Sequence, residues 1–580
     1  MAGALNMTGF KVEHLRFSST AVREMKTLGD KFTNWPVVYT LNNATKIYVG
    51  ETLNASARMN QHQASTEKAD LTSLRVVVNE TFNKSACLDL ESFLIRLFAG
   101  EGRYQVLNRN EGVTDRDYYD RDEYRKTFQE VFEDLRSEGL FQRTIPQIEN
   151  SDLFKFSPFK ALNHDQATAV EDILEGLFSD IESGSSGTIV VQGDPGTGKT
   201  IVAIYMMKLL RDIQNSDPAE DYDSDSLFSD FFLEGHRELL QGFRIGLVVP
   251  QQSLRDSIRK VFKKTPLLAP AMVLSPFDLG AIEGKYDLLI VDESHRLNQR
   301  ANQPSGPQNK KFREINEKLF GSDHLSYTQL DWIREKSTHQ ILLVDSAQSV
   351  RPADLPEAVL NSLINNSKLD ARYYRLFSQM RVRGGADYVD YVRAVLSPAP
   401  PTPTSFGDYD LRFFDDIRIM SDQITLRESE TQLARLVAGY AWEWKSRNNA
   451  TAFDIEIDGS EFRWNQTQKD WINTAGSINE VGSIHTVQGY DLNYAGVIVG
   501  PDLRFDPVEQ RLYIHRASYF DKKGKENNPK LGITYSDGDL LRYITNVYAV
   551  LMTRGILGTY VYVCDRPLRE YLRGYLSEIK

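Results

Sequence analysis

The chain has 580 residues, a formal net charge of −12 and a pI near 5.4. This length exceeds what a single hydrophobic core supports, so several domains are expected. Two cysteines, Cys87 and Cys564, are too few for a disulfide framework or a zinc site, and no apolar run is long enough to cross a membrane. We therefore expect a cytoplasmic protein with no membrane partner. The acidic balance does not exclude nucleic acid as a partner, because a motor or a nuclease needs only a local basic groove.

The N-terminal part of the chain alternates short β-like runs with helical patterns. Residues 1–32 are expected to form a leader with one helix. Within 33–110, the runs VVYTL and KIYVG precede the helical pattern LDLESFLIRLFAG, which indicates a small α/β domain. Residues 111–155 are highly charged with helical periodicity, which is typical of a connector.

The rest of the chain consists of strongly apolar runs separated by helical patterns. The apolar runs read TIVVQG, IGLVVP, DLLIVD, QILLVD, GVIVG and TYVYVCD. Such runs are typical of parallel sheets that helices cover on both faces. We expect one sheet domain within 156–370 and a second within 371–580, with a Pro-rich break at 396–405 near their junction. The predicted fold class is α/β.

The strongest motif is GDPGTGKT at 193–200, between the strand TIVVQ and the helix IVAIYMMKLL. Its glycines allow backbone N–H groups to turn onto phosphate oxygens, and the N-terminus of the helix adds its dipole. Lys199 would neutralise the β- and γ-phosphates, and Thr200 would hold Mg²⁺. The segment predicts a nucleotide site formed by Gly193, Pro195, Gly196, Thr197, Gly198, Lys199 and Thr200.

A second strand, YDLLIVDESH, ends in two carboxylates. A carboxylate at the carboxyl end of such a strand can reach Mg²⁺ directly or through water, and its neighbour can orient and deprotonate the attacking water. We assign the first role to Asp292 and the second to Glu293.

Motifs from LNHDQ (162–166) to VYAVLMTRGILGTYVYV (547–563) resemble those of superfamily 1 helicases, in the same order. The resemblance implies two RecA-like lobes that bind ATP. Gln166 stands where the family reads adenine, and Gln348, in LLVDSAQ, where it senses the γ-phosphate. Arg381, in LFSQMR, and Arg554 stand where arginines meet the phosphates.

The fifth of these motifs, SIHTVQGYDLNYAGVIVG, contributes Gln488, Gly489 and Asp491 to the predicted nucleotide site. Many relatives carry lysine in place of Gln488 and glutamate in place of Asp491. Translocation without strand separation, or ATP as a conformational switch, therefore stays open beside strand unwinding. The segments HTVQGYDL and LMTRGILGTYVY resemble those of the bacterial family related to Schlafen-type helicase domains.

The runs VVYTLNN and KIYVGET resemble the two tyrosine strands of the GIY-YIG nucleases, although the first reads Val-Val-Tyr. The family places an arginine eight positions after the glycine of the second run and a histidine four positions later, where this chain has Arg58 and His62. It also carries a metal-binding glutamate on a helix and a closing asparagine. The resemblance implies that the site residues are Tyr39, Tyr48, Arg58, His62, Glu91 and Asn108.

The implied chemistry is phosphodiester hydrolysis. One Mg²⁺, or Mn²⁺, on Glu91 could act as a Lewis acid, and Arg58 could hold the non-bridging oxygens. Tyr39 is assigned as the general base, with Tyr48 and His62 positioning water or substrate. A phenol with a pKa near 10 is a poor base at neutral pH, so the metal or Arg58 must lower its pKa.

Together the two resemblances imply an ATP- and Mg²⁺-dependent nuclease–helicase that acts on nucleic acid, DNA rather than RNA, in defence against phage or in DNA repair. Two alternatives stay open. The chain could be a nucleic-acid-stimulated ATPase sensor whose N-terminal domain recognises a structure without cutting it, or a nuclease–helicase directed at RNA. A homo-oligomer or an additional defence-system partner is compatible with each of them.

Overall fold

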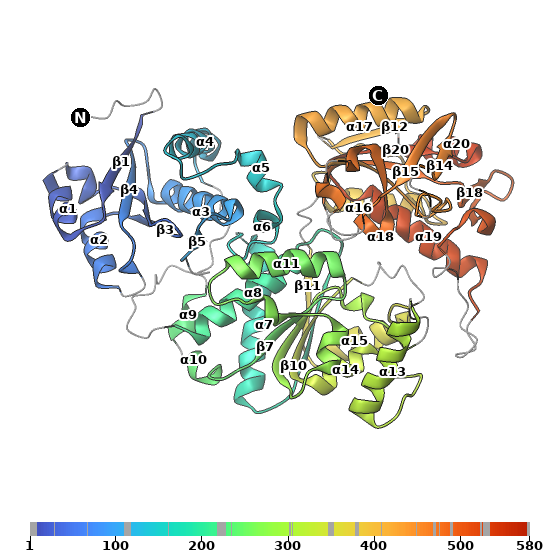
Figure 1. Cartoon of the computed structure of the whole chain (residues 1–580), viewed down its shortest axis with the longest axis horizontal. Coiled ribbons are helices and arrows are strands. Elements are labelled where there is room, and N and C mark those ends of the chain that lie inside the picture. Colours follow the sequence, from blue (N-terminus) through green and yellow to red (C-terminus); the bar gives the residue numbers. More distant parts are fainter. Residues whose placement is uncertain are drawn as a thin grey trace. The chain divides into compact units, whose positions relative to one another are not determined.

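The structure is a computed structural model (Figure 1). Its contacts divide the chain into two compact units: Met1–Glu171, Ile204–Gly242 and Ser257–Met272 form the first, and Asp172–Ala203, Phe243–Asp256 and Val273–Lys580 the second. The residues described are 9–27, 29–65, 68–108, 118–160, 162–216, 228–233, 235–300, 303, 305–345, 353–377, 382–407, 409–447, 449, 451–467, 471–474, 476–487, 491–521, 525 and 534–576.

The N-terminal domain is built on a five-stranded sheet with the order β1-β4-β2-β3-β5. All neighbouring strands are antiparallel except β3 and β5, which are parallel. The strands are β1 (Phe10–Arg16), β2 (Val37–Asn42), β3 (Lys46–Thr52), β4 (Ser73–Asn79) and β5 (Gln105–Val106), and the helices are α1 (Ser19–Glu24), α2 (Ala55–Ala64) and α3 (Lys84–Glu101).

Both faces of this sheet are covered, because every residue of β2 is buried. Val37, Tyr39 and Leu41 pack in a cluster that includes Ala55 and Met59 of α2. Residues on the opposite face, such as Val38 and Val49, pack in a cluster with α3. The sheet therefore lies between α2 and α3 (Figure 1).

The segment predicted as a leader is part of this sheet. Residues Phe10–Arg16 form β1 and pair antiparallel with β4 along their whole length. The leader interpretation was wrong for these residues, because pairing with a non-local strand satisfies their backbone groups.

The connector packs against the end of α3. Its helices are α4 (Arg121–Ser137), α5 (Ile145–Glu149) and α6 (Asp152–Lys155). Arg143 Nη2 donates to the carbonyl oxygens of Gly100 and Glu101 at 2.5 and 2.7 Å, which satisfies acceptors that the helix end leaves open. A Cβ on Gly100 would lie 2.7 Å from Ile148 Cγ2 and 2.8 Å from Phe154 Cβ, so only glycine allows this approach.

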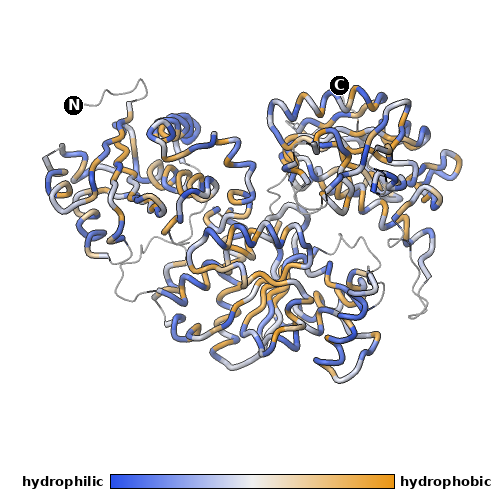
Figure 2. Tube along the Cα trace, viewed as in Figure 1, coloured by the Kyte–Doolittle hydropathy of each residue, from blue (hydrophilic) through white to orange (hydrophobic). Residues whose placement is uncertain are grey.

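The second unit contains a six-stranded sheet, here called the first lobe, with the order β11-β6-β10-β9-β7-β8 and parallel neighbours throughout. Figure 2 shows its strands as a strongly hydrophobic stretch of chain. The strands are β6 (Thr188–Gly193), β7 (Ile245–Val248), β8 (Val273–Leu274), β9 (Tyr286–Val291), β10 (Ser337–Val344) and β11 (Tyr373–Leu376). Because β11 pairs with β6, this sheet extends past residue 370, where the sequence analysis ended the first lobe.

Along this part of the chain the helices are α7 (His164–Glu182), α8 (Lys199–Gln214), α9 (Ser229–Leu233), α10 (His236–Leu239), α11 (Gln252–Lys264), α12 (Pro276–Ala281), α13 (Gly306–Phe320), α14 (Gln329–Lys336) and α15 (Glu357–Leu369). None of the helices in the described ranges is both long enough and apolar enough to span a membrane.

The second lobe has a seven-stranded sheet with the order β12-β20-β17-β13-β16-β15-β14, in which only β14 and β15 are antiparallel. The strands are β12 (Asp410–Phe414), β13 (Ala434–Ala438), β14 (Ile455–Ile457), β15 (Ser460–Trp464), β16 (Glu480–Ser483), β17 (Leu492–Val499) and β20 (Gly555–Val563), with a separate hairpin of β18 (Leu503–Asp506) and β19 (Arg511–Ile514). The helices are α16 (Gly385–Val395), α17 (Ile417–Thr431), α18 (Ile484–Val487), α19 (Asp537–Met552) and α20 (Arg566–Leu576).

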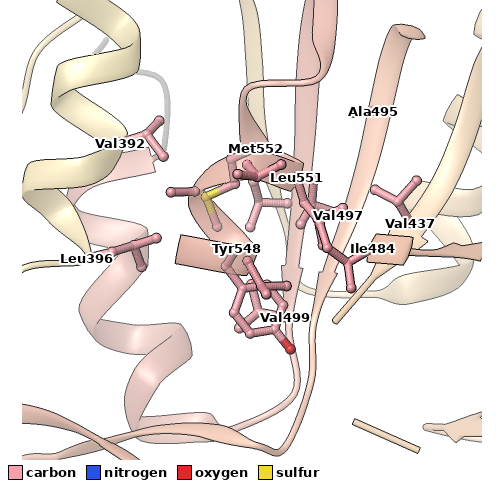
Figure 3. Close-up of a cluster of buried hydrophobic side chains, with 14 of the residues drawn as sticks. Val392, Leu396, Val437, Ile484, Ala495, Val497, Val499, Tyr548, Leu551 and Met552 are labelled. Atoms are coloured by element: carbon pink, nitrogen blue, oxygen red, sulfur yellow. The ribbon is translucent and has the colours of Figure 1, made fainter. Parts of the chain in front are cut away.

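The core of the second lobe gathers around α19. Tyr548, Leu551 and Met552 of this helix lie among Val497 and Val499 of β17 (Figure 3). The two parallel sheets confirm the predicted α/β class for the ATPase part of the chain.

Tyr548→Phe is expected to destabilise the second lobe by about 1–3 kcal/mol, because it deprives a buried carboxylate of a donor. The Tyr548 hydroxyl donates to Asp502 Oδ1 at 2.6 Å and accepts from the Gly500 N–H at 2.9 Å. Burial raises the pKa of Asp502 to about 6, which marks this carboxyl as poorly solvated. Thermal unfolding measures the effect, with Tyr513→Phe on the exposed side of β19 as the control. Equal unfolding temperatures for the two variants would contradict this account.

Candidate functional site

The phosphate loop connects β6 to α8 and wraps around Lys199. Lys199 Nζ donates to the carbonyl oxygens of Gly193 and Asp194 at 2.7 and 2.9 Å, and lies 3.6 Å from Asp345 Oδ2. Gly196 and Gly198 have φ values of 88° and 81°, which favour glycine. The loop therefore has the conformation in which backbone N–H groups and one buried ammonium can surround phosphate oxygens.

Thr200 and Asp292 form the predicted magnesium pair. Thr200 Oγ1 donates to Asp292 Oδ2 at 2.7 Å, at the end of β9. Burial and the charge of Glu293 raise the pKa of Asp292. A hydroxyl and a carboxylate that face each other are oxygen ligands of the kind that Mg²⁺ prefers, so the two residues fit a Mg²⁺ shared with nucleotide phosphates.

Glu293 is held by two basic side chains that the sequence analysis did not identify. Arg296 Nε donates to Glu293 Oε2 at 2.9 Å, and His295 Nε2 lies 3.1 Å from the same oxygen. The Asp345 N–H donates to His295 Nδ1 at 3.3 Å. Burial alone would raise the pKa of Glu293, but His295 and Arg296 hold it well below its ordinary value. Glu293 is therefore ionised at neutral pH and suited to orienting a water.

A further contact with the phosphate loop comes from α16, where Arg393 Nη1 donates to Asp194 Oδ1 at 2.7 Å. Arg554 is buried directly before β20, and its carbonyl accepts from the Leu492 N–H at 3.2 Å. Asp491 directly precedes β17. The remaining predicted residues, Gln348, Arg381, Gln488 and Gly489, lie outside the described residues.

Gln166 is buried in the first turn of α7, in the first unit. Its side-chain oxygen accepts from the Asn163 N–H at 3.3 Å, and its own N–H donates to Asn163 Oδ1 at 2.8 Å. This reciprocal pair is a helix cap. The adenine-reading role of Gln166 stays a prediction.

In the N-terminal domain, β2 and β3 place both tyrosines on one face of the sheet. Their antiparallel register sets Tyr39 opposite Gly50 and Leu41 opposite Tyr48, so the two phenols are diagonal neighbours. The ring centroids of Tyr39 and Tyr48 are 6.2 Å apart. Helix α2 lies on this face and is capped by Asn54, whose side chain accepts from the Ala57 N–H at 2.9 Å.

Helix α2 brings the predicted arginine and histidine to these tyrosines. Arg58 and His62 are one turn apart, as their spacing predicted. Tyr39 Oη and His62 Nε2 are 2.6 Å apart, and the ring centroids of Tyr48 and His62 are 5.1 Å apart. Arg58 and the two tyrosines interact electrostatically. Four of the six predicted residues therefore meet in one place.

Gly50 makes this arrangement possible. A Cβ at this position would overlap Tyr39 Oη and Cζ and would lie 2.9 Å from Cε1. The Tyr39 ring thus lies where any other residue at position 50 would project its side chain.

Asn108 hydrogen-bonds the backbone of β3, and its catalytic role stays a prediction. Its side-chain oxygen accepts from the Val49 N–H at 3.1 Å, and its Nδ2 donates to the Val49 carbonyl at 2.7 Å. Asn108 therefore fixes the β3 backbone next to Gly50, which positions the site without needing to contact a substrate.

The buried environment sets the protonation of the site. Burial raises the pKa of Tyr39 well above its ordinary value; Tyr48 and Glu91 add to the rise, and Arg58 opposes it. Burial would lower the pKa of Arg58, but the two tyrosines raise it above its ordinary value. Burial, Lys68 and Arg58 lower the pKa of His62 to about 3. At neutral pH, Arg58 is therefore charged and His62 is neutral.

Glu91 lies on α3, and its charge acts on both Tyr39 and Cys87. Throughout the described ranges, no group of three or more His, Cys, Asp or Glu side chains is arranged to hold a metal ion. A metal at Glu91 would have to complete its shell with phosphate and water oxygens. Mg²⁺ is commonly bound in this way, by one or two carboxylates together with substrate phosphates, so Glu91 fits such an ion.

The family model for the Schlafen group 3 DNA/RNA helicase domain matches residues 186–565. The chain belongs to this family. The match spans the phosphate loop, the Asp292–Glu293 pair and Arg554, and it identifies a nucleic-acid-binding ATPase of the helicase type. The N-terminal domain and the whole of α7 precede the matched residues.

One curated protein and one solved structure are also similar to the chain. An uncharacterized protein of Saccharomyces cerevisiae, YPL245W, is 24% identical over 411 residues, which cover 66% of this chain and 83% of the yeast protein. The crystal structure of a Pif1 helicase from Bacteroides, in complex with ADP-AlF3 and single-stranded DNA, is similar at 13% identity over 67% of this chain and 91% of that chain, with a TM-score of 0.23. A score of this size does not define a shared arrangement of domains.

Lys199→Ala and Glu293→Gln are expected to stop ATP hydrolysis for different reasons. Lys199→Ala removes the ammonium in the phosphate loop and should abolish nucleotide binding. Glu293→Gln keeps the loop and should retain binding, while hydrolysis falls by about 100-fold or more. Steady-state ATPase assays and equilibrium binding of a fluorescent ATP analogue measure the two effects. Lys126→Ala, on the exposed side of α4, is the control, and a Glu293→Gln rate equal to that of the control would contradict the assignment.

Proposed function

We propose that the chain is an ATP- and Mg²⁺-dependent nuclease–helicase, with DNA as the preferred substrate and a role in defence against phage or in DNA repair. The ATPase part would bind or translocate on the strand, and the N-terminal domain would hydrolyse its phosphodiester bonds. The observation that carries the proposal is the meeting of Tyr39, Tyr48, Arg58 and His62 over Gly50.

This cluster favours cutting over recognition alone. Tyr39 is fully buried, its hydroxyl is hydrogen-bonded to His62, and the charge of Arg58 acts on it. Burying a phenol, an imidazole and a guanidinium together is unfavourable unless their polar atoms are paired, and such groups gather at catalytic sites. A domain that only recognised a strand would need exposed basic or aromatic side chains instead.

Each residue of the cluster has a defined part in hydrolysis. Arg58 would hold the non-bridging phosphate oxygens and stabilise the charge that develops on them. Tyr39 would take the proton of the attacking water, while Tyr48 and His62 fix its orientation. An ion held by Glu91 would supply Lewis acidity and favour ionisation of the phenol. Tethering the cutting domain to the motor raises the local concentration of the strand at this site.

Glu91→Gln is expected to abolish cleavage and leave nucleic-acid-stimulated ATP hydrolysis unchanged, because Glu91 lies outside the ATPase lobes. The assay follows end-labelled single-stranded DNA and RNA of one sequence with Mg²⁺, with and without ATP. Glu123→Gln, an exposed glutamate of α4, is the matched control. Preferential cutting of RNA would favour the RNA-directed alternative.

The alternative, an ATPase sensor that recognises nucleic acid without cutting it, predicts a different result in the same assay. It predicts that nucleic acid stimulates ATP hydrolysis in the wild type while neither strand is cut under any condition. Cleavage that survives in Glu91→Gln would also overturn the nuclease assignment.

A further inference from the structure

Lys68 contacts two residues of the proposed cleavage site, although it belongs to none of the motifs in the sequence. It follows α2 in the chain, and its Nζ lies 3.1 Å from His62 Nδ1. The same Nζ lies 3.7 Å from the centroid of the Tyr48 ring, a distance typical of a cation–π contact. The ammonium is therefore held between the imidazole and the face of a phenol.

The contact between Lys68 and His62 determines which ring nitrogen carries the proton. An ammonium can only donate, so His62 Nδ1 must accept. His62 is buried and neutral, as its lowered pKa shows, so its single ring proton lies on Nε2. Nε2 is the atom 2.6 Å from Tyr39 Oη, and the Tyr39 oxygen is therefore the acceptor in that hydrogen bond.

We propose that Lys68 is a positioning residue of the cleavage site that selects the His62 tautomer with Nε2–H directed at Tyr39 Oη. The inference rests on the proposed nuclease function and adds a residue to it. The Arg58 guanidinium also acts on Tyr39 and lowers its pKa against the effect of burial.

The tautomer decides how His62 affects the proposed base. Hydrogen bonds donated to an oxygen stabilise its ionised form, so Nε2–H favours the Tyr39 phenolate, the form that can accept a proton from water. In the other tautomer, an unprotonated Nε2 would accept the phenol hydrogen and favour the neutral phenol. Of the remaining groups around Tyr39, Arg58 favours the phenolate, while Tyr48 and Glu91 disfavour it. Lys68 thus sets whether His62 supports or opposes Arg58.

The test combines Lys68→Met, which keeps the length of the side chain and removes its donors, with Lys68→Arg, which restores donors. Lys46→Met is the control, since Lys46 in the same domain pairs with Asp70 at 2.9 Å. The full-length chain is labelled with ¹⁵N at the histidine rings, and long-range ¹H–¹⁵N spectra report the tautomer of His62, assigned with His62→Gln. Cleavage of labelled single-stranded DNA with Mg²⁺ gives kcat and KM for each variant.

We expect the Nε2–H tautomer in the wild type, Lys46→Met and Lys68→Arg, and a loss of that tautomer in Lys68→Met. We also expect kcat for cleavage to fall by about tenfold or more in Lys68→Met, with KM unchanged, and to recover in Lys68→Arg. An unchanged His62 tautomer in Lys68→Met, or a changed tautomer with unchanged kcat, overturns the inference while the nuclease function stands. A wild type that cuts no nucleic acid overturns the proposed function, and the role of Lys68 with it.

Discussion

The arrangement of the N-terminal site depends on the close approach between the Tyr39 ring and the backbone of Gly50. Because residue 50 has no side chain, the phenol can lie across β3 and bring its oxygen to 2.6 Å from His62. The antiparallel register of β2 and β3 then places Tyr48 beside it. Asn108, near the C-terminal end of the domain, makes two hydrogen bonds with the backbone of Val49 and so fixes β3 next to Gly50.

A histidine of the first lobe has a hydrogen-bond arrangement similar to that of His62. In both places a donor lies at Nδ1 of a buried histidine, and Nε2 lies near an oxygen of a second side chain, 2.6 Å from Tyr39 Oη for His62 and 3.1 Å from Glu293 Oε2 for His295. The donor is the Lys68 ammonium for His62 and the Asp345 backbone N–H for His295.

Local patterns in the sequence predicted the parts of the sites that local geometry determines. The spacing of Arg58 and His62 predicted that they lie on one face of a helix, as they do on α2. The glycines of the phosphate-loop motif include Gly196 and Gly198, which have positive φ in the structure. Contacts between segments that are far apart in the sequence could not be predicted from such local patterns. Lys68 comes from a loop with no periodicity and Arg393 from a separate helix, and β1 became an edge strand only through pairing with β4. The segments YDLLIVDESH and QILLVD could have indicated His295 and Asp345, because Asp345 directly follows β10 and His295 lies four residues after the end of β9.

The DNA cleavage activity of a Gly50→Ala variant most directly tests the close approach of the Tyr39 ring to Gly50. The added methyl group needs the space of the Tyr39 ring, so the close approach predicts that this variant loses DNA cleavage while its nucleic-acid-stimulated ATP hydrolysis matches the wild type. Gly306→Ala, where an added Cβ meets nothing within 4 Å, should behave as wild type in both assays. Wild-type cleavage by Gly50→Ala would contradict the placement of Tyr39 over β3 and the cleavage site built on it.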